Sequence, residues 1–207
     1  MTSVSNTSES QIKKRAIFLL LISTTYGLLA SFVLTMEKIH SLIDPVYVPS
    51  CSINPIISCA NAMNSAQAEL FGIPNSLFGI IAYTAFFVIA MLLLVGVKFP
   101  KLIWIFLGIG SLLAVIFVHY LIIESIFFMH VICPWCFGLW ITTPLLFIAI
   151  IKIGVSQWRS AENTVAKFVQ NIAKHSATLL TIWYVVLAAA IITVFWEFWA
   201  SLMVVPL

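Results

Sequence analysis

The residues with the clearest chemical potential are four cysteines, arranged in two pairs of different spacing. Cys133 and Cys136 are two residues apart in the stretch HVICPWCFGLW (residues 130–140), whereas seven residues separate Cys51 from Cys59. A Cys-x-x-Cys pair can form a disulfide that another thiolate opens again, so it is typical of thiol–disulfide exchange. The same spacing also occurs in one half of a zinc site.

The apolar run after Cys133 predicts a helix that begins at the Cys-x-x-Cys pair. Pro134 would then occupy an early helical position, where its missing N–H costs no hydrogen bond. Cys133 would lie at the positive end of the helix dipole, which stabilises a thiolate and lowers the pKa of the thiol. Cys136 would lie one turn deeper, towards the apolar interior.

The second pair suggests a mobile relay. Cys51 and Cys59 flank Pro55 in a predicted loop, and exchange requires direct contact between sulfur atoms. We therefore expect this pair to collect electrons and deliver them to Cys133 and Cys136. Two alternatives remain open at this point: two static disulfides that pin the loop, or a four-thiolate zinc site, for which the spacing of the outer pair is too wide.

The chain that carries these cysteines is strongly apolar. Hydrophobic residues make up 62% of its 207 residues and charged residues 8%, against about half and a quarter in soluble proteins. A membrane span needs about 20 consecutive apolar residues. Five runs qualify, and they predict an all-α integral membrane protein: residues 16–36, 76–97, 102–128, 132–151 and 179–200.

The basic residues predict the orientation of these spans, because lysine and arginine cluster at cytoplasmic ends. Nine of the ten precede the first run or lie between the second and third or the fourth and fifth; Lys38 is the exception. The positions of the basic residues thus explain the net charge of +3 by the membrane topology, and the charge does not indicate a nucleic-acid partner. We expect a cytoplasmic amino terminus, a retained first span (the alternative is a cleaved signal peptide) and all four cysteines outside, where disulfides persist.

The cysteine pattern resembles the vitamin K epoxide reductase family, in its bacterial form. The resemblance is carried by the widely spaced pair in the first outer loop, by CANAMNSAQAELFGIPNSLFG (residues 59–79) and by CPWC (residues 133–136), and it extends over about residues 16–150. It implies a four-helix transmembrane bundle around a quinone, here followed by a fifth transmembrane helix. It also implies an active-site disulfide between Cys133 and Cys136, with Cys136 nearest the quinone, and a shuttle pair of Cys51 and Cys59.

We accordingly expect four segments along the chain. They are a cytoplasmic tail (1–15), a four-helix catalytic domain (16–153) with an outer loop (37–75), a cytoplasmic interfacial segment (154–178), and a fifth span with an outer carboxyl terminus (179–207). In the outer loop, Ser58 is expected to cap a short surface helix that reaches about Leu70.

The resemblance implies that Asn75 donates a hydrogen bond to the quinone carbonyl and that Ser65 acts in the loop and the pocket. Four aromatic residues are candidates for the pocket lining, with ordinary core packing as the alternative: Phe71, Phe78, Phe137 and Trp140. Trp140 stands where vertebrate members carry a tyrosine, which favours reduction of the quinone itself over epoxide chemistry. Glu124 or His119, near the expected site, are candidates for passing protons, with interfacial solvation as the alternative.

The resemblance implies a membrane thiol–disulfide oxidoreductase of the bacterial inner membrane that supports disulfide formation and reduces ubiquinone or menaquinone. Many bacterial relatives carry a fused thioredoxin-like domain after the fifth span, but this sequence ends at Leu207. We therefore expect the electron donor to be a separate thioredoxin-like protein of the DsbA type, and no metal site. The alternative from a different class is a non-enzymatic membrane scaffold with two structural disulfides.

Overall fold

The structure is a computed structural model that describes residues 2–70, 72–157 and 164–204. Over these residues the chain consists of helices joined by loops. The elements in chain order are α1 (Thr2–Ile43), α2 (Cys59–Met63), the 3-10 helix η1 (Ala66–Glu69), α3 (Asn75–Leu94), α4 (Lys101–Ile123), the π-helix η2 (Glu124–Met129), α5 (Pro134–Gln157), α6 (Thr164–Val194) and α7 (Trp196–Val204). Five of the described helices are long and apolar enough to cross a membrane. The all-α membrane fold is confirmed.

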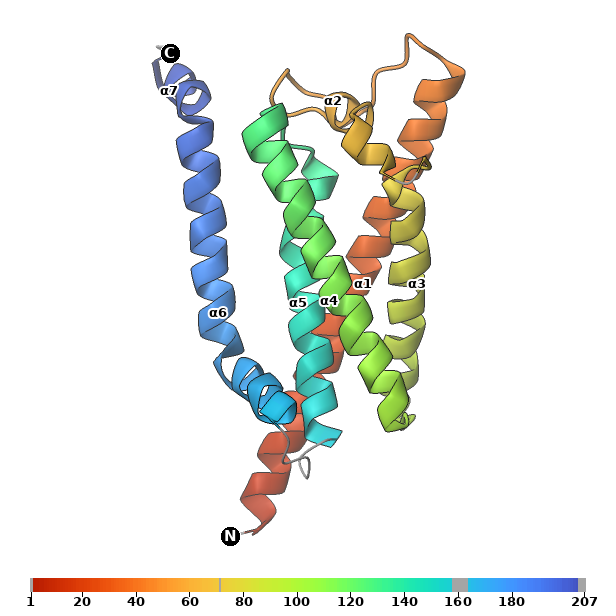
Figure 1. Ribbon diagram of the computed structural model, residues 1–207, viewed down its shortest axis with the longest axis vertical. Coiled ribbons are helices and arrows are strands. Elements are labelled where there is room, and N and C mark those ends of the chain that lie inside the picture. Colours follow the sequence, from red (N-terminus) through yellow and green to blue (C-terminus); the bar gives the residue numbers. More distant parts are fainter. Residues whose placement is uncertain (1, 71, 158–163, 205–207) are drawn as a thin grey trace.

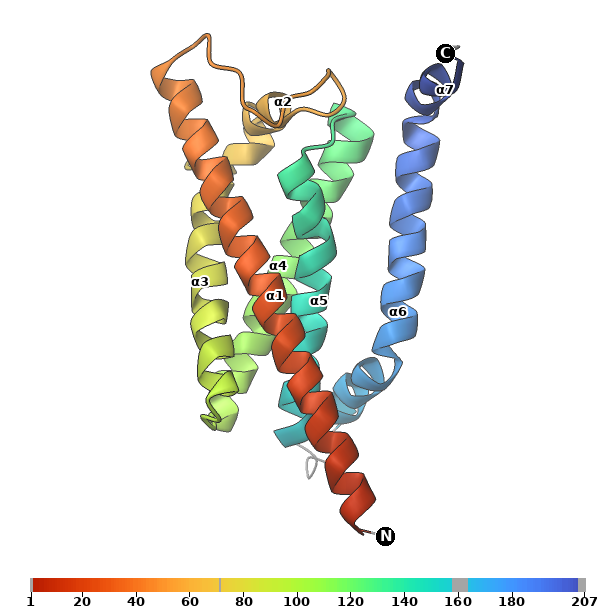
Figure 2. The ribbon, with the colours of Figure 1, turned by 180° about the vertical axis from the view of Figure 1, so that it is seen from behind.

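Helices α1, α3, α4 and α5 form a bundle, and α6 runs beside it (Figure 1). Helix α5 packs against α1, α4 and α6, and α1 also packs against α3. The loop that carries α2 lies across one end of the bundle, and the reverse view shows the same arrangement (Figure 2). We call this end the cysteine end. Helix α1 begins at the opposite end, which is also the end of the turn that joins α3 to α4 (Figures 1 and 2).

Turn residues explain why the chain reverses its direction between α3 and α4. Gly96 has a positive φ of 90°, which a residue without a Cβ adopts readily. The N–H of Gly96 donates to the carbonyl of Leu93 and that of Val97 to the carbonyl of Leu92, which is a helix-terminating Schellman motif. Pro100 then precedes the first residue of α4, a position that tolerates proline well.

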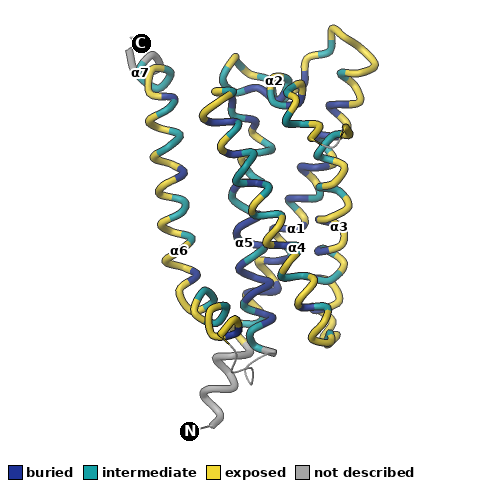
Figure 3. The backbone as a smooth tube through the Cα atoms, in the orientation of Figure 1, coloured by how far each residue is buried: buried dark blue, intermediate teal, exposed yellow. Residues whose placement is uncertain are grey.

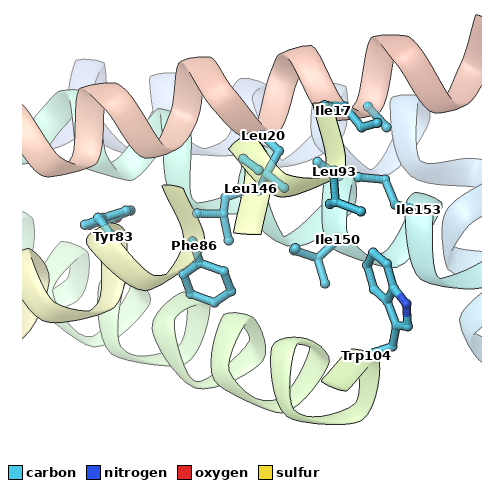
Figure 4. Close-up of a cluster of buried hydrophobic side chains, with 12 residues drawn as sticks. Ile17, Leu20, Tyr83, Phe86, Leu93, Trp104, Leu146, Ile150 and Ile153 are labelled. Atoms are coloured by element: carbon cyan, nitrogen blue, oxygen red, sulfur yellow. The ribbon is translucent and has the colours of Figure 1, made fainter. Parts of the chain in front are cut away.

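The core of the bundle lies between α1 and α5 and their neighbours. Figure 3 shows buried residues concentrated on these two helices, while much of α3, α4 and α6 is exposed. In a membrane protein such exposed apolar faces suit contact with lipid. One cluster of buried side chains joins α1, α3, α4 and α5 (Figure 4): Ile17, Leu20, Tyr83, Phe86, Leu93, Trp104, Leu146, Ile150 and Ile153.

Pro144 lies inside α5, and nearby side chains bond the carbonyl groups around it. The hydroxyl of Thr143 donates to the carbonyl of Leu139 at 2.7 Å, and that of Tyr184 on α6 donates to the carbonyl of Ile141 at 2.8 Å. Pro144 has no N–H to donate to the carbonyl of Trp140. The two hydroxyls bond the carbonyls on either side of that one, and the bond from Tyr184 ties this turn of α5 to α6.

One continuous helix crosses the predicted boundary between the interfacial segment (154–178) and the fifth span (179–207). Helix α6 runs without interruption from Thr164 to Val194, and the division into these two parts stays a prediction. The ribbon of α6 bends near its beginning (Figure 1). This stretch contains neither glycine nor proline, so no residue type that ends a helix separates the two parts.

Candidate redox site

The Cys-x-x-Cys pair lies at the start of α5, as the sequence predicts. Helix α5 begins at Pro134, and the N–H of Phe137 donates to the carbonyl of Cys133 at 2.8 Å. Cys133 is therefore the residue that caps α5, and its carbonyl accepts the first helical hydrogen bond. Cys136 follows one turn into the helix and is half-buried.

The chain reaches this position through an unusual turn after α4. The π-helix η2 ends at Met129 and is capped by His130, which adopts a left-handed conformation with φ 53° and ψ 42°. The N–H of Val131 donates to the carbonyl of Ser125 at 3.0 Å, and the Ser125 hydroxyl donates back to the carbonyl of Val131. These bonds fix the direction in which the chain approaches Cys133.

A parallel β-bridge then joins the loop between α1 and α3 to the residue before Cys133. The N–H of Ile132 donates to the carbonyl of Ile56 at 2.7 Å, and the N–H of Ser58 donates to the carbonyl of Ile132 at 3.1 Å. Cys59 directly follows Ser58, and Cys133 directly follows Ile132. The bridge therefore brings two cysteines together that are distant in sequence, and no sequence pattern indicated it.

The surface helix of the loop is shorter than expected. Ser58 caps α2 as predicted, since its hydroxyl accepts from the N–H of Asn61 at 3.2 Å. However, α2 ends at Met63, and Ser65 is extended with φ −75° and ψ 150° before η1 begins. The Ser65 hydroxyl donates to the carbonyl of Ala62 at 2.8 Å. Serine often bonds a nearby backbone group in this way, in competition with helix continuation.

The four sulfur atoms meet at this site. Cys51 and Cys59 form a disulfide, and the Sγ of Cys59 lies 3.3 Å from the Sγ of Cys133. Cys59 and Cys133 are fully buried, whereas Cys51 is half-buried. Cys133 and Cys136 are free thiols. The arrangement holds one disulfide in contact with a thiol that can attack it.

The surroundings of Cys133 favour its thiolate. The Cys136 thiol donates a hydrogen bond to Cys133, and the backbone N–H groups of Cys136 and Trp135 point at the same sulfur. These interactions lower the pKa of Cys133 below its ordinary value, although burial opposes them. A sulfur with a lowered pKa is both more often a thiolate and a better leaving group.

Tyr26 of α1 lies against the first turn of α5. Its hydroxyl donates to the carbonyl of Trp135 at 3.3 Å, and the two rings lie 6.3 Å apart. A Cβ atom at Gly138 would collide with the Tyr26 hydroxyl. The absence of a side chain at Gly138 therefore allows α1 to approach α5 closely. Neither residue was singled out from the sequence.

The proposed pocket residues have the following places. Asn75 begins α3, where its Nδ2 donates to the carbonyl of Gln67 at 2.6 Å and its Oδ1 accepts from the N–H of Leu70 at 3.3 Å. Its amide therefore holds η1. Phe137 and Trp140 pack edge to face with ring centroids 5.9 Å apart. Trp140 is buried, Phe137 and Phe78 are partly exposed, and Phe71 lies outside the described residues.

The two candidates for proton transfer lie on the segment that leads to the cysteine end. The Nε2 of His119 accepts from the indole N–H of Trp183 on α6 at 2.6 Å, and its Nδ1 pairs with the carbonyl of Val115 at 2.7 Å. Both ring nitrogens therefore have a hydrogen-bond partner, one on α4 and one on α6. Glu124 begins η2 and is half-buried.

Two charged residues at the end of α1 also belong to the site. Glu37 accepts hydrogen bonds from Tyr47 and Ser50. Lys38 contacts Met63, Asn64 and Glu69 in the segment after Cys59. Neither charge was expected at the site, but Lys38 carried a signal as the one basic residue outside the predicted cytoplasmic segments.

Fold and site together define a membrane-embedded redox protein with a disulfide in contact with a Cys-x-x-Cys pair. The family model described as vitamin K epoxide reductase family matches residues 18–151. The chain belongs to this family, and it is therefore a membrane oxidoreductase. A search of curated proteins finds no match.

Proposed function

We propose that this protein oxidises the dithiol of a separate thioredoxin-like protein and passes the electrons through its two cysteine pairs to a quinone. The observation that carries the proposal is the 3.3 Å contact between the Sγ atoms of Cys59 and Cys133, with Cys59 in a disulfide to Cys51. Thiol–disulfide exchange needs this kind of direct contact. A purely structural disulfide has no need of a free thiol against it.

The proposed relay has two exchange steps after the partner has reduced the loop pair. The Cys59 thiolate attacks Cys133 in the Cys133–Cys136 disulfide, which forms a Cys59–Cys133 bond and releases the Cys136 thiolate. Cys51 then attacks Cys59, and Cys133 leaves as a thiolate. The lowered pKa of Cys133 favours this second step. The products are a closed Cys51–Cys59 disulfide and two thiols, which is the arrangement in the structure.

Burial supports the assignment of Cys51 as the sulfur that meets the partner. Cys59 is fully buried against Cys133, while Cys51 is partly accessible. An incoming thiolate therefore reaches Cys51 first, and Cys59 is the leaving sulfur that then contacts Cys133. The partner transfers two electrons and two protons to the loop pair and leaves with a disulfide of its own.

The proposed electron acceptor at Cys136 is a quinone, which we propose to be ubiquinone or menaquinone. Cys136 lies one turn into α5 next to Phe137, whose apolar ring is partly exposed and supports this proposal. Phe78 and Asn75 at the start of α3 remain proposed contacts of the quinone. A quinone accepts two electrons and two protons, which matches what Cys133 and Cys136 release when they form their disulfide.

The proposed location is the bacterial inner membrane. The basic residues support an orientation with the cysteine end outside, where an oxidising environment preserves disulfides. The direct test is a quinone-reduction assay with the purified protein and a reduced thioredoxin-like protein. The reaction is monitored by the absorbance of the quinone. We expect turnover that is lost in Cys133→Ser and Cys51→Ala. Intact disulfides without any turnover, with each quinone and several such partners, would instead support a membrane scaffold.

A further inference from the structure

Two neighbouring charged residues, Glu37 and Lys38, are buried in the last turns of α1, each with 8% of its surface exposed. Charged groups are costly to bury in a membrane protein and are usually kept for a function. Both lie in the helix that also supports the first turn of α5 through Tyr26. Their contacts divide the loop between α1 and α3 into two halves.

Glu37 holds the half that carries Cys51. The hydroxyl of Tyr47 donates to its Oε2 and the hydroxyl of Ser50 donates to its Oε1, both at 2.7 Å. Ser50 directly precedes Cys51 in the chain. Hydrogen bonds to a carboxylate are stronger than those between neutral groups, so the backbone beside Cys51 is fixed to α1 independently of the disulfide.

Lys38 holds the half that carries Cys59. Its Nζ donates to the carbonyl of Met63 at 3.1 Å. Met63 is the last residue of α2, the helix that begins at Cys59. The same Nζ donates to the Oδ1 of Asn64 at 3.4 Å and forms an ion pair of 3.0 Å with Glu69. The lysine charge thus anchors the carboxyl-terminal end of α2, where it also suits the helix dipole.

We propose that Glu37 and Lys38 are positioning residues that hold Cys51 and Cys59 separately while the loop disulfide is open. The inference rests on the proposed relay, in which Cys59 must reach Cys133 and Cys51 must afterwards reach Cys59. Once the Cys51–Cys59 bond opens, it no longer holds the two halves together. Two adjacent residues of one rigid helix then keep both sulfurs near their targets, which raises the effective concentration of each.

The proposal has a measurable consequence in the Cys136→Ser protein. A single disulfide is then shared among Cys51, Cys59 and Cys133, and it resides either in Cys51–Cys59 or in Cys59–Cys133. These forms have the same composition and differ by one exchange, so their ratio reports which sulfur is held closer to Cys59. Glu37 favours the first form because it anchors Cys51, and Lys38 favours the second because it anchors Cys59 beside Cys133.

The experiment measures this ratio by mass spectrometry of non-reduced peptides after equilibration, without partner or quinone. In the Cys136→Ser protein we expect Glu37→Gln to raise the share of Cys59–Cys133 and Lys38→Met to lower it. Each shift should be on the order of tenfold, the factor expected when one charge-assisted hydrogen bond no longer favours one form. A general loosening of the loop would move both variants in the same direction.

Controls keep the test independent of folding. Ser50→Ala removes a Glu37 contact from an exposed loop position and should act in the same direction as Glu37→Gln. Lys38→Arg retains the charge and should restore most of the ratio. Asp44→Asn removes a carboxylate of the same loop that bonds its own turn, the N–H of Val46, and should leave the ratio unchanged.

Equal ratios in all variants, or shifts of Glu37→Gln and Lys38→Met in one direction, would overturn the positioning roles. The same variants can be assayed for quinone turnover in the chain with all four cysteines. Unchanged ratios together with normal turnover would refute this inference and leave the proposed function standing. Loss of turnover in every preparation would count against the proposed function, whatever the ratios are.

Discussion

Cys59 and Cys133 are 74 positions apart in the chain, yet their sulfur atoms lie 3.3 Å apart and both side chains are fully buried. The β-bridge between Ile57 and Ile132 produces this contact, because each bridge residue lies within two positions of one of the cysteines. Cys59 is also the first residue of α2, and Cys133 caps α5. Backbone structure on both sides therefore holds the two sulfurs in place.

The orientation in the membrane gives a first prediction. Once reduced, Cys51 should react with a membrane-impermeant maleimide added from outside to intact cells or spheroplasts, since it is the more accessible loop sulfur. A cysteine introduced at Lys98, in the turn at the opposite end of the bundle, should react after permeabilisation. Labelling of Cys51 from the cytoplasmic side alone would refute the topology and with it the oxidising environment.

The lowered pKa of Cys133 predicts the pH dependence of its alkylation. Because a thiol reacts as thiolate, the rate rises as pH passes upward through the pKa. With the loop disulfide intact, the midpoint for Cys133 should lie below that of an ordinary cysteine, about 8.5. Cys136→Ala removes the largest cause of the shift, so the midpoint should move upward. The rate is read from the peptide that contains Cys133, and a midpoint above the ordinary value would contradict the assignment.

Asn75 remains a predicted contact of the quinone carbonyl. Loss of a donor to an oxygen that gains negative charge costs roughly 3 kcal/mol of transition-state stabilisation, so Asn75→Ala should slow quinone reduction by about a hundredfold. Since Asn75 also holds Gln67 and Leu70, formation of the Cys59–Cys133 linkage is measured in the same variant. Unchanged turnover would remove Asn75 from the site, and loss of the linkage alone would make it a residue of the loop.

The fifth span is joined to the bundle by hydrogen bonds that can be removed singly. Trp183→Phe eliminates the bond to His119 and should lower the unfolding free energy by about 0.6–1.7 kcal/mol, the range for such bonds in membranes. Trp196→Phe, at an exposed position beyond α6, is the matched control. The measurement is denaturant unfolding in detergent, and an equal loss in both variants would show that the bond is not the cause.

The sequence predicted the elements of this fold better than their contacts. The five apolar runs and the start of a helix at Pro134 follow from composition and local rules, which need no tertiary information. The cap formed by Ser58 followed for the same reason. The early end of α2 was missed, because the extended conformation of Ser65 depends on how the loop folds.

The parts of the site that were missed depend on residues distant in sequence. The bridge at Ile132 consists of backbone hydrogen bonds, which leave no side-chain pattern to detect. Glu37 was unremarkable in sequence because its partners are an ordinary tyrosine and serine ten and thirteen positions away. Lys38 was visible as an exception to the charge pattern, but its partners in the folded loop were not.

The relay is tested most directly by trapping its intermediate. Cys136→Ser and Cys51→Ala each remove one of the two sulfurs that resolve a Cys59–Cys133 bond. The Cys51→Ala protein should therefore accumulate that linkage, and the Cys136→Ser protein should hold it in exchange with the Cys51–Cys59 disulfide, both seen by mass spectrometry of non-reduced peptides. The 3.3 Å contact between the sulfur atoms of Cys59 and Cys133 is the reason. A Cys51–Cys133 linkage in the Cys136→Ser protein would contradict the account, because it would make Cys51 the sulfur that attacks the Cys-x-x-Cys pair.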